Sequence, residues 1–360
     1  MRAAVAAVAL FALTLPLLWH GGPDGDIVEL HGYGHAVLDG QLPYRDFPLE
    51  YPPGSIPLFT LPALGGDYLT LFRLEAALGW AVVIVLVAAL RPSNSLLLAG
   101  VALTPLALGP FSHERFDAWS TALALAALLA FLRARPVAAA VLVALGALVK
   151  VWPLVLLPLF LLRGLPRRAV AAGAVVLAAG LAPFAAAAPA GSYNAFAGQL
   201  HRPLEVETIA ASALLALGRP VRVFFDSGSW NLAGSRAHAL ATLHGLVELA
   251  ALVGVVWIFA RSRRTTADVV AATAAAVAVV AILGKVLSPQ YLLWVAPFAA
   301  LASPLACVPL AGACVATHLL HTPWFGDLLR KDAGAVALLG ARNVLLLATL
   351  GLLVRRGARA

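Results

Sequence analysis

Charged side chains are scarce in this chain of 360 residues. Only 12% of the residues are charged and 62% are hydrophobic, whereas about a quarter of an ordinary soluble domain is charged. The mean hydropathy is +0.92. Because apolar runs recur along the whole chain, a soluble domain with a single anchor is excluded as well. The sequence predicts an all-α polytopic membrane protein.

Cysteine is nearly absent. The two residues, Cys307 and Cys314, lie seven positions apart in one apolar run, about 10 Å along a helix and too far for a disulfide. We expect both to be buried apolar side chains. His318 and His321 share one helical turn, but no cysteine or carboxylate nearby completes a zinc ligand set. We therefore expect no metal and no cofactor.

Nucleotide-binding signals are also missing. The chain has no Gly-rich phosphate loop and no soluble α/β segment that could hold a sugar nucleotide. Its net charge of +8 would suit a nucleic-acid binder, but the arginines concentrate in short loops beside apolar runs. Orientation in a membrane explains them better, so we expect no nucleic-acid partner.

The apolar runs indicate about twelve membrane spans, at about 1.5 Å of rise per residue. The first run has the general look of a signal peptide, but its core is too long and no small-x-small cleavage site precedes His20, so we expect an uncleaved helix. The predicted spans cover residues 3–19, 70–90, 96–110, 118–132, 137–149, 152–162, 169–188, 239–260, 267–284, 291–304, 306–320 and 334–354.

Arginine marks one side of the predicted topology. Alternation of the spans puts both termini on one side, and the positive-inside rule makes this side the cytoplasm. We therefore predict a multi-pass plasma-membrane protein with both termini in the cytoplasm. The arginines on this side are Arg2, Arg91, Arg133, Arg135, Arg163, Arg167, Arg168, Arg261, Arg263, Arg264, Arg355, Arg356 and Arg359.

Acidic residues favour the opposite, outer side. Glu75 and Glu248 lie inside predicted spans and Asp268 lies at a cytoplasmic end, while the other 14 of the 17 acids are predicted to lie outside. Long outer loops need solubilising groups, which accounts for most of these acids taken singly. The outer acids are Asp24, Asp26, Glu29, Asp39, Asp46, Glu50, Asp67, Glu114, Asp117, Glu205, Glu207, Asp226, Asp327 and Asp332.

Residues 41–57, QLPYRDFPLEYPPGSIP, need a further explanation. Their five prolines fix φ, bias the preceding residues toward extended conformations and prevent a helix. A loop that is only solvated has no need of such stiffness. We therefore predict an active site on the outer face, with this stiff acidic segment in a first outer loop of residues 20–69. A second large outer loop covers residues 190–238.

Residues 26–39 are predicted to form a helix that ends at Gly40. Asp26, Glu29 and Tyr33 follow along its edge, a pattern typical of a helix lying on a membrane surface. Asp26 is therefore expected at the boundary between lipid and water. The residues that share the apolar face are Ile27, Leu30, Gly34, Val37 and Leu38.

Four further sequence segments point to a known group of enzymes: G-x-x-P-Y-R-D-F-x-x-E-Y-P-P-G at 40–54, KVWP at 150–153, HRPLEVET at 201–208 and KVLSPQYLLW at 285–294. In these segments the chain resembles the GT-C superfamily of polytopic glycosyltransferases, and more narrowly glycosyltransferase family 87. That family includes actinobacterial mannosyltransferases of phosphatidylinositol mannoside synthesis. Arg342-Asn343 in the last span also has family counterparts, and order and spacing agree over most of the chain.

The resemblance implies an inverting transfer of a hexose, with mannose as the expected sugar. The donor would be a polyprenyl-phosphate sugar, and the acceptor a glycolipid or glycan of the cell envelope. An acceptor hydroxyl attacks the anomeric carbon while polyprenyl phosphate leaves, so the reaction needs a carboxylate base and cations at the phosphate. The implied base is Asp26, with Asp46 in reserve. The chain departs from many relatives in having Leu30 in place of an aromatic residue, and Asp24 is a competing aspartate.

Three cations are expected to bind the donor phosphate: Lys150, Lys285 and Arg342. Lys150 lies between two short apolar runs, and Arg342 lies roughly 12 Å inside the last span, where a charge needs an anionic partner. The simpler explanations are snorkelling of the lysines to the headgroups and structural pairing of Arg342. The substrate cavity is expected to include Tyr44, Arg45, Glu50, Tyr51, Arg115, Asp117, His201, Arg202, Gln290 and Tyr291.

Two other classes of protein remain as alternatives. A secondary transporter of a lipid-linked or small polar substrate would account for broken helices and intramembrane charges. The sequence has no convincing internal repeat, however, and its ionisable groups gather at the outer face. A purely structural membrane protein would not explain the stiff acidic loop. We therefore take residues 1–360 as one integral membrane glycosyltransferase domain, surrounded by membrane lipid.

Overall fold

A computed structural model describes residues 2–19, 22, 25–91 and 94–359. The competing aspartate Asp24 lies outside these described residues. The fold is nearly all helical, and the chain divides into two compact units. The first unit comprises Met1–Ala102 and Pro110–His201, and the second comprises Leu103–Gly109 and Arg202–Ala360.

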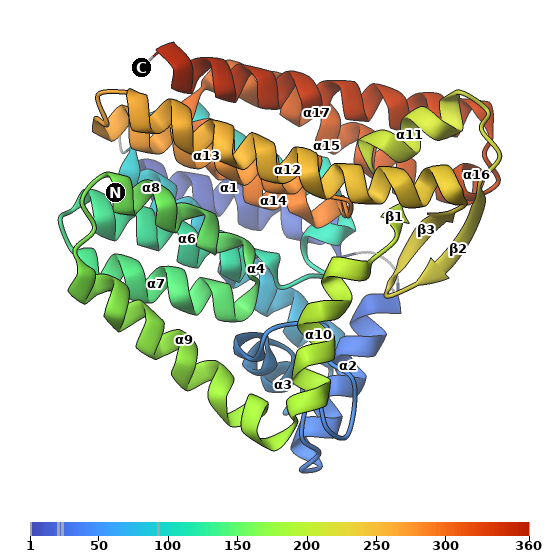
Figure 1. Cartoon of the computed structure of the whole chain (residues 1–360), viewed down its shortest axis with the longest axis horizontal. Helices are drawn as coiled ribbons and strands as arrows, with labels where there is room; N and C mark the ends of the chain where they lie inside the picture. Colours follow the sequence, from blue (N-terminus) through green and yellow to red (C-terminus); the bar gives the residue numbers. More distant parts are fainter. Residues whose placement is uncertain (1, 20–21, 23–24, 92–93, 360) are drawn as a thin grey trace. The chain divides into compact units, whose positions relative to one another are not determined.

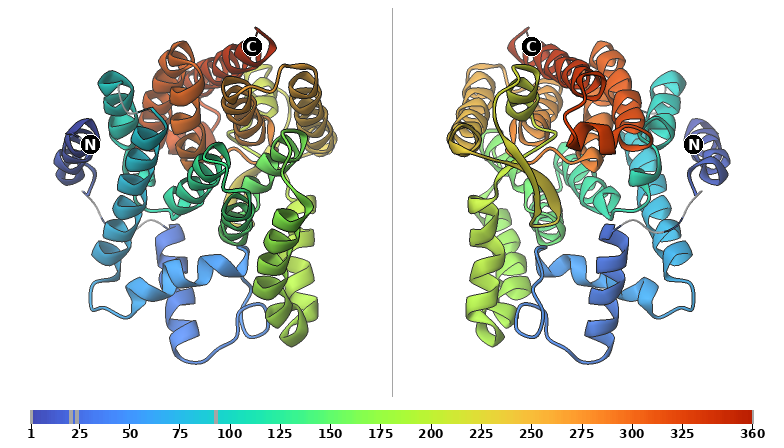
Figure 2. Two further views of the ribbon diagram at one scale, coloured as in Figure 1. Left: turned by 90° about the vertical axis from the view of Figure 1, so that its left-hand side faces the viewer. Right: turned by 90° about the vertical axis from the view of Figure 1, so that its right-hand side faces the viewer.

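The first unit is a helical bundle. Helices α4, α6, α7 and α9 pack against one another in sequence, and α2 packs on α3. Figure 2 shows α2, α3 and the loop between them (blue) gathered beside one end of α4. The helices are α1 (Arg2–Leu18), α2 (Gly25–Leu38), α3 (Ile56–Ala63), α4 (Tyr68–Leu90), α5 (Ser95–Leu108, whose last residues belong to the second unit), α6 (Asp117–Leu132), α7 (Pro136–Val149), α8 (Leu156–Leu162), α9 (Arg167–Ala187) and α10 (Pro189–His201).

The second unit combines helices with a small antiparallel sheet of order β1-β3-β2. Helices α12, α13 and α17 run side by side (Figure 1). Leu204, Leu232 and Leu339 belong to its apolar core. Its elements are β1 (Leu204–Glu205), α11 (Ile209–Ala216), β2 (Arg222–Asp226), β3 (Ser229–Ala233), α12 (Ser235–Arg261), α13 (Thr266–Leu283), α14 (Leu292–Ala302), α15 (Cys307–His321), α16 (Phe325–Leu329) and α17 (Ala333–Arg359).

Helix ends follow local sequence signals. Asp67 and Thr208 cap α4 and α11 with their side chains, and Thr265 forms a capping box with Asp268 at the start of α13. Gly40 has φ +81 and follows α2, which confirms the predicted end of that helix. Cys307 and Cys314 are both free thiols in α15; Cys314 is buried, as expected, whereas Cys307 is only partly buried.

Each predicted span coincides with a helical segment, but the lengths differ. Among the described residues, six helices are long and apolar enough to cross a membrane: Tyr68–Leu90, Arg167–Ala187, Ser235–Arg261, Thr266–Leu283, Pro304–His321 and Ala333–Gly357. Shorter apolar helices account for most of the remaining runs. The chain is thus consistent with a multi-pass membrane protein, while the number of spans and the side on which each terminus lies stay predictions.

Candidate active site

The loop between α2 and α3 is held in one shape by short polar contacts. The Asp46 carboxylate accepts the Leu42 N–H at 2.7 Å and pairs with Arg45 at 2.8 Å. These contacts, led by the hydrogen bond from Arg45, lower the pKa of Asp46 to about 2. Tyr44 adopts a left-handed backbone with φ +69 inside this turn. Asp46 therefore serves the shape of the loop.

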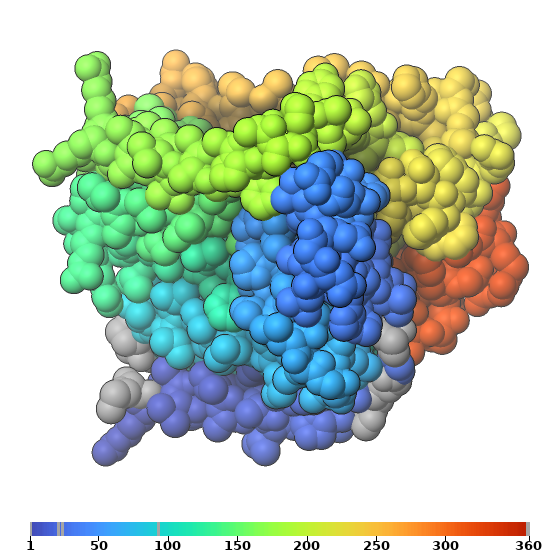
Figure 3. Space-filling view, turned by 90° about the horizontal axis from the view of Figure 1, so that it is seen from below, coloured from blue at the N-terminus to red at the C-terminus, as the bar shows by residue number. Residues whose placement is uncertain are grey.

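Gly54 lets the loop lie directly on the end of α7. A Cβ atom at this position would lie 2.7 Å from the carbonyl carbon and oxygen of Leu148, closer than a side chain tolerates. Lys150 follows two residues later as the C-cap of α7. The prolines and Gly54 thus bring the loop to Lys150, and Figure 3 shows the loop region (blue) at the surface of the first unit.

Lys150 is surrounded by one carboxylate and two aromatic rings. Its Nζ donates to both carboxylate oxygens of Asp117, at 2.8 and 2.9 Å. The same nitrogen lies 5.6 Å from the ring centre of Tyr51 and 5.2 Å from that of Phe116, within cation–π distance. The Tyr44 hydroxyl donates to the Tyr51 carbonyl oxygen at 2.6 Å. Lys150 is therefore fixed where the loop, α6 and α7 meet.

Asp26, the predicted base, forms an ion pair with Arg115. The Arg115 Nη2 and Asp26 Oδ2 atoms lie 2.7 Å apart, and the side chains are 9% and 33% exposed. Arg115 also donates to the Glu114 carbonyl oxygen at 2.7 Å. The position of the arginine is thus fixed by two contacts, while a third of the Asp26 side chain stays exposed.

Tyr51 lies near both ion pairs. Burial raises the pKa of its hydroxyl well above the usual range, and the charges of Asp26, Arg115, Asp117 and Glu50 act on it as well. These groups therefore share the neighbourhood of one tyrosine. We call Asp26, Glu50, Tyr51, Arg115, Asp117 and Lys150 the Asp26 cluster.

A second group of charges lies in the second unit. The Lys285 carbonyl oxygen accepts the Glu205 N–H at 3.1 Å, and the Glu205 carboxylate accepts from the Leu287 N–H and, at 3.3 Å, from the Ser288 hydroxyl. Burial and the nearby Arg202 guanidinium lower the pKa of Lys285. The HRPLEVET and KVLSPQYLLW segments are therefore parts of one local structure.

Arg342 is fully buried inside the second unit. Its Nε donates to the Thr317 hydroxyl at 3.1 Å, and its Nη1 donates to the Glu207 carbonyl oxygen at 3.1 Å. The Glu207 carboxylate lies 3.4 Å from Arg342 Nη2 and 2.9 Å from His321 Nε2. Asn343 Nδ2 donates to the Glu207 and Thr208 carbonyl oxygens. Arg342 thus has an acidic partner, as its depth in the span predicts, and this partner is Glu207.

The predicted site residues separate into several groups. The Asp26 cluster gathers six of them, and Tyr44 adjoins it. Arg45 and Asp46 form their own exposed pair, and His201 is exposed at the end of α10. In the second unit, Arg202 lies near Lys285, while Gln290 is buried and Tyr291 stacks on Trp294 at 3.9 Å.

Sequence reasoning did not find two of the buried pairs. Arg73, in the apolar helix α4, pairs with Glu114 just before α6. Its position inside a span was the available signal, because a charge there needs a partner. His321 was weighed as a zinc ligand, whereas it contacts Glu207. No group of three metal-binding side chains occurs in the described parts of the chain.

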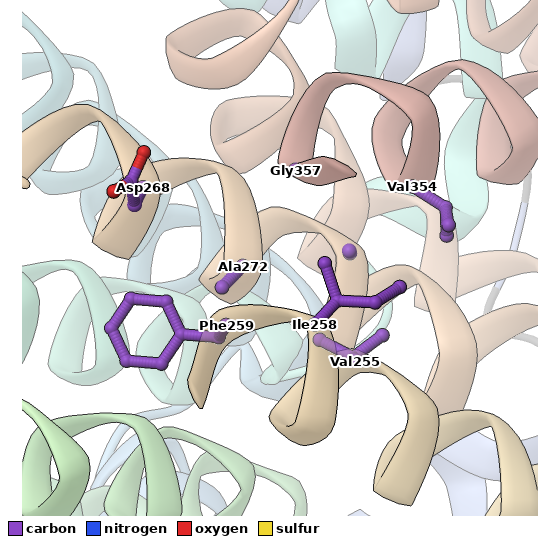
Figure 4. Close-up of a pocket in the computed structure, with 8 residues that line it drawn as sticks. Val255, Ile258, Phe259, Asp268, Ala272, Val354 and Gly357 are labelled. Atoms are coloured by element: carbon purple, nitrogen blue, oxygen red, sulfur yellow. The ribbon is translucent and has the colours of Figure 1, made fainter. Parts of the chain in front are cut away.

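A crevice between α12, α13 and α17 is too small for a substrate (Figure 4). Its free volume is about 10 Å³, room for about one water molecule. Its lining is apolar apart from Asp268, whose Oδ1 has no hydrogen-bond partner among the described residues.

Comparison with known proteins identifies the family. No curated protein matched the chain, whereas the model of glycosyltransferase family 87 matches residues 49–289, more than half of it. The matched range contains Tyr51, Lys150 and Lys285, and it excludes Asp26 and Arg342. The chain therefore belongs to glycosyltransferase family 87 and is a sugar-transferring enzyme.

Proposed function

We propose that the enzyme transfers a hexose, with mannose as the first candidate, from a polyprenyl-phosphate sugar to a glycolipid or glycan of the cell envelope. The observation that carries this proposal is the Asp26 cluster. It combines a carboxylate that a substrate can reach, 33% exposed and paired with Arg115, with a second cation at Lys150. A base and cations are what displacement of a lipid phosphate requires.

In the proposed reaction, an acceptor hydroxyl attacks the anomeric carbon and polyprenyl phosphate leaves from the opposite side. The new glycosidic bond forms as the bond from carbon to phosphate oxygen breaks, so the configuration inverts. A β-linked donor would give an α-glycoside. Asp26 accepts the hydroxyl proton, and Arg115 holds the Asp26 carboxylate in place.

Asp26 is a better candidate base than Asp46. Both carboxylates pair with an arginine, but that of Asp46 also accepts the Leu42 N–H, and its pKa of about 2 makes it a weak proton acceptor. Asp26 also shares its surroundings with Tyr51 and the Asp117 ion pair. We therefore assign the base to Asp26 and keep Asp46 as the reserve.

We assign the phosphate to Lys150 and keep Lys285 and Arg342, which belong to the second unit, as the other phosphate-binding candidates that the sequence predicts. Asp117 holds the Lys150 ammonium where the loop, α6 and α7 meet, and the positive charge there is what would attract a phosphate oxygen. Lys285 offers a second cation, next to Arg202. Arg342 is fully buried and acts through Glu207, whose carboxylate and backbone it contacts.

Transfer from polyprenyl-phosphate mannose in proteoliposomes tests the proposal. Asp26→Asn keeps the size of the side chain but removes the proton acceptor, so transfer should fall by about 10²- to 10⁴-fold. Asp39→Asn is the matched control, because Asp39 is exposed just beyond the other end of α2. Normal transfer by Asp26→Asn, with loss in Asp46→Asn, would move the base to Asp46.

A transfer that requires a nucleotide sugar would overturn the proposed donor. The acceptor is identified separately, by mass spectrometry of envelope glycolipids in a deletion strain. Accumulation of a glycolipid that lacks one hexose would name the acceptor. An unchanged glycolipid profile would contradict an envelope glycolipid and direct the search to a glycan.

A further inference from the structure

An aromatic groove of about 350 Å³ runs through the first unit between the α2–α3 loop and helices α9 and α10. Tyr44 and Pro53 line it from the loop, Phe184 and Ala185 from α9, and Phe196 from α10. None of the lining residues is charged. Such a surface fits a hydrocarbon and gives a charged ligand no compensating partner.

The walls of the groove are fixed before any ligand binds. A Cβ atom at Gly191 would lie 1.7 Å from the Tyr44 carbonyl oxygen, so only glycine lets α10 start this close to the loop. The Tyr44 and Phe184 rings pack edge to face with centres 5.6 Å apart. The loop, α9 and α10 are therefore joined around the groove, and Figure 3 shows the loop region (blue) beside α9 and α10 (yellow-green).

The groove lies beside one end of a candidate membrane span. Helix α9 is one of the candidate spans, yet only 11% of its apolar stretch is buried in the protein. Ala185 is exposed at the end of this helix, and Tyr193 of α10 is 71% exposed. A lipid chain could therefore enter from the side, without crossing water.

One wall of the groove adjoins the Asp26 cluster through Tyr44. Tyr44 lines the groove and donates its hydroxyl proton to the Tyr51 carbonyl oxygen at 2.6 Å. The Tyr51 ring lies 5.6 Å from Lys150 Nζ. One tyrosine thus separates a hydrocarbon surface from the cation that the proposed function assigns to the phosphate.

We propose that this groove holds the polyisoprenyl chain of the lipid-phosphate donor, with the phosphate at Lys150 and the chain passing Tyr44 towards Phe184 and Phe196. This assignment rests on the proposed function, because there the lipid that reaches Tyr51 is the donor, with its phosphate, and not the acceptor. Because the chain moves from lipid to protein, its binding comes from packing against the aromatic faces and not from escape from water.

A pair of tryptophan variants tests the groove. Ala185→Trp fills it, whereas Ala186→Trp puts the same bulk on the next exposed residue of α9, which does not line it. With a long-chain donor, Ala185→Trp should raise KM about tenfold or more, the usual effect of overpacking a site. A donor with a single isoprene unit should be used equally well by both variants and by the unchanged enzyme.

Two kinetic results would overturn the proposal. One is an Ala185→Trp enzyme with an unchanged KM for the long-chain donor. The other is a rise in the KM for the acceptor alone, which would assign the groove to an acyl chain of the acceptor.

Photolabelling separates the groove from the transfer reaction. A polyprenyl phosphate that carries a diazirine near its phosphate end, without a sugar, should label α9 or α10 in the unchanged enzyme and in Ala186→Trp. Ala185→Trp should lose this label. If the groove is labelled but the unchanged enzyme transfers no sugar from a polyprenyl-phosphate sugar, the groove binds the lipid chain and the proposed function is refuted. Labelling confined to other segments would refute the groove.

Discussion

At the scale of single residues, Lys150 combines a structural and a functional role. Its partner Asp117 is 1% exposed, and Lys150 itself is 12% exposed. Removing one member of such a pair leaves a buried charge without compensation, which costs about 3–5 kcal/mol of stability. Replacing both members with apolar groups of similar volume is often neutral. The pair therefore allows the two roles of Lys150 to be separated.

We predict that Lys150→Met lowers both stability and donor use. The double variant Lys150→Met with Asp117→Leu should regain most of the stability but not the donor use. Donor use by the double variant should stay reduced by about 2–5 kcal/mol, because the phosphate has lost a charged contact. Thermal unfolding in detergent and kcat/KM for the donor measure the two effects. A stable double variant with a normal kcat/KM would show that Lys150 has only a structural role.

The chemistry of single residues is partly readable from the sequence. The acidic, proline-rich segment and the predicted interfacial position of Asp26 led to three members of the Asp26 cluster: Asp26, Glu50 and Tyr51. The partners were less accessible, because Arg115 and Asp26 lie far apart in the chain and only the packing of the first unit brings them together. Glu207 likewise reaches Arg342 from 135 residues away. Local patterns indicate that a buried charge needs a partner, but they do not name the partner.

At the scale of elements, a glycine sets the contact between the loop and α7. The backbone of Leu148 leaves no room for a Cβ atom at Gly54. We predict that Gly54→Ala displaces the loop from Lys150, with a cost of about 1–3 kcal/mol, as for other overpacked sites. Transfer should fall with it, because Tyr51 and Lys150 would no longer be held together.

Gly66→Ala is the matched control for this prediction. A Cβ atom at Gly66 would meet nothing within 4 Å, so both stability and transfer should stay near those of the unchanged enzyme. The unfolding temperatures and transfer rates of Gly54→Ala and Gly66→Ala measure the difference. Equal behaviour of the two alanine variants would mean that the loop does not depend on its contact with Leu148.

Helices were easier to predict than the sheet. The apolar runs and the breaks at Gly40 and Lys150 define the helices, since both signals are local. The hairpin of β2 and β3 was read as part of an outer loop. Its signal is a short turn, Ser227-Gly228, with φ values of 51° and 67° between two runs that contain aromatic residues. Such turns favour a hairpin, so the sequence contained the information.

At the scale of the whole molecule, hydropathy does not separate helices that face lipid from helices in the core. Helices α9 and α13 have nearly equal hydropathy, 2.0 and 2.2, yet 11% of the first and 72% of the second is buried. Lipid tails and protein interiors are similarly apolar, so both surroundings select the same residues. Hydropathy alone therefore does not determine how many of the apolar helices cross the membrane, because that number also depends on how the helices pack.

Orientation in the membrane, in contrast, depends on charge. Arginines gather in loops that alternation assigns to one side, so we predict that both termini are cytoplasmic and that the α2–α3 loop lies outside. An alkaline phosphatase fusion after Gly54 should be active, and one after Arg264 inactive. The reverse activities would put the Asp26 cluster on the cytoplasmic side and contradict an outward-facing active site.

Cysteine labelling of the unfused protein gives an independent check of the orientation. It is practical because the sequence contains only two cysteines, Cys307 and Cys314. Replacing both gives a parent without thiols, into which Asp39→Cys or Thr266→Cys is introduced at an exposed position. A thiol reagent that does not cross membranes should label Asp39→Cys in intact cells, and Thr266→Cys only after the cells are opened. Labelling of Thr266→Cys in intact cells would show that the loop between α12 and α13 lies outside, and the arginine asymmetry would then need another cause.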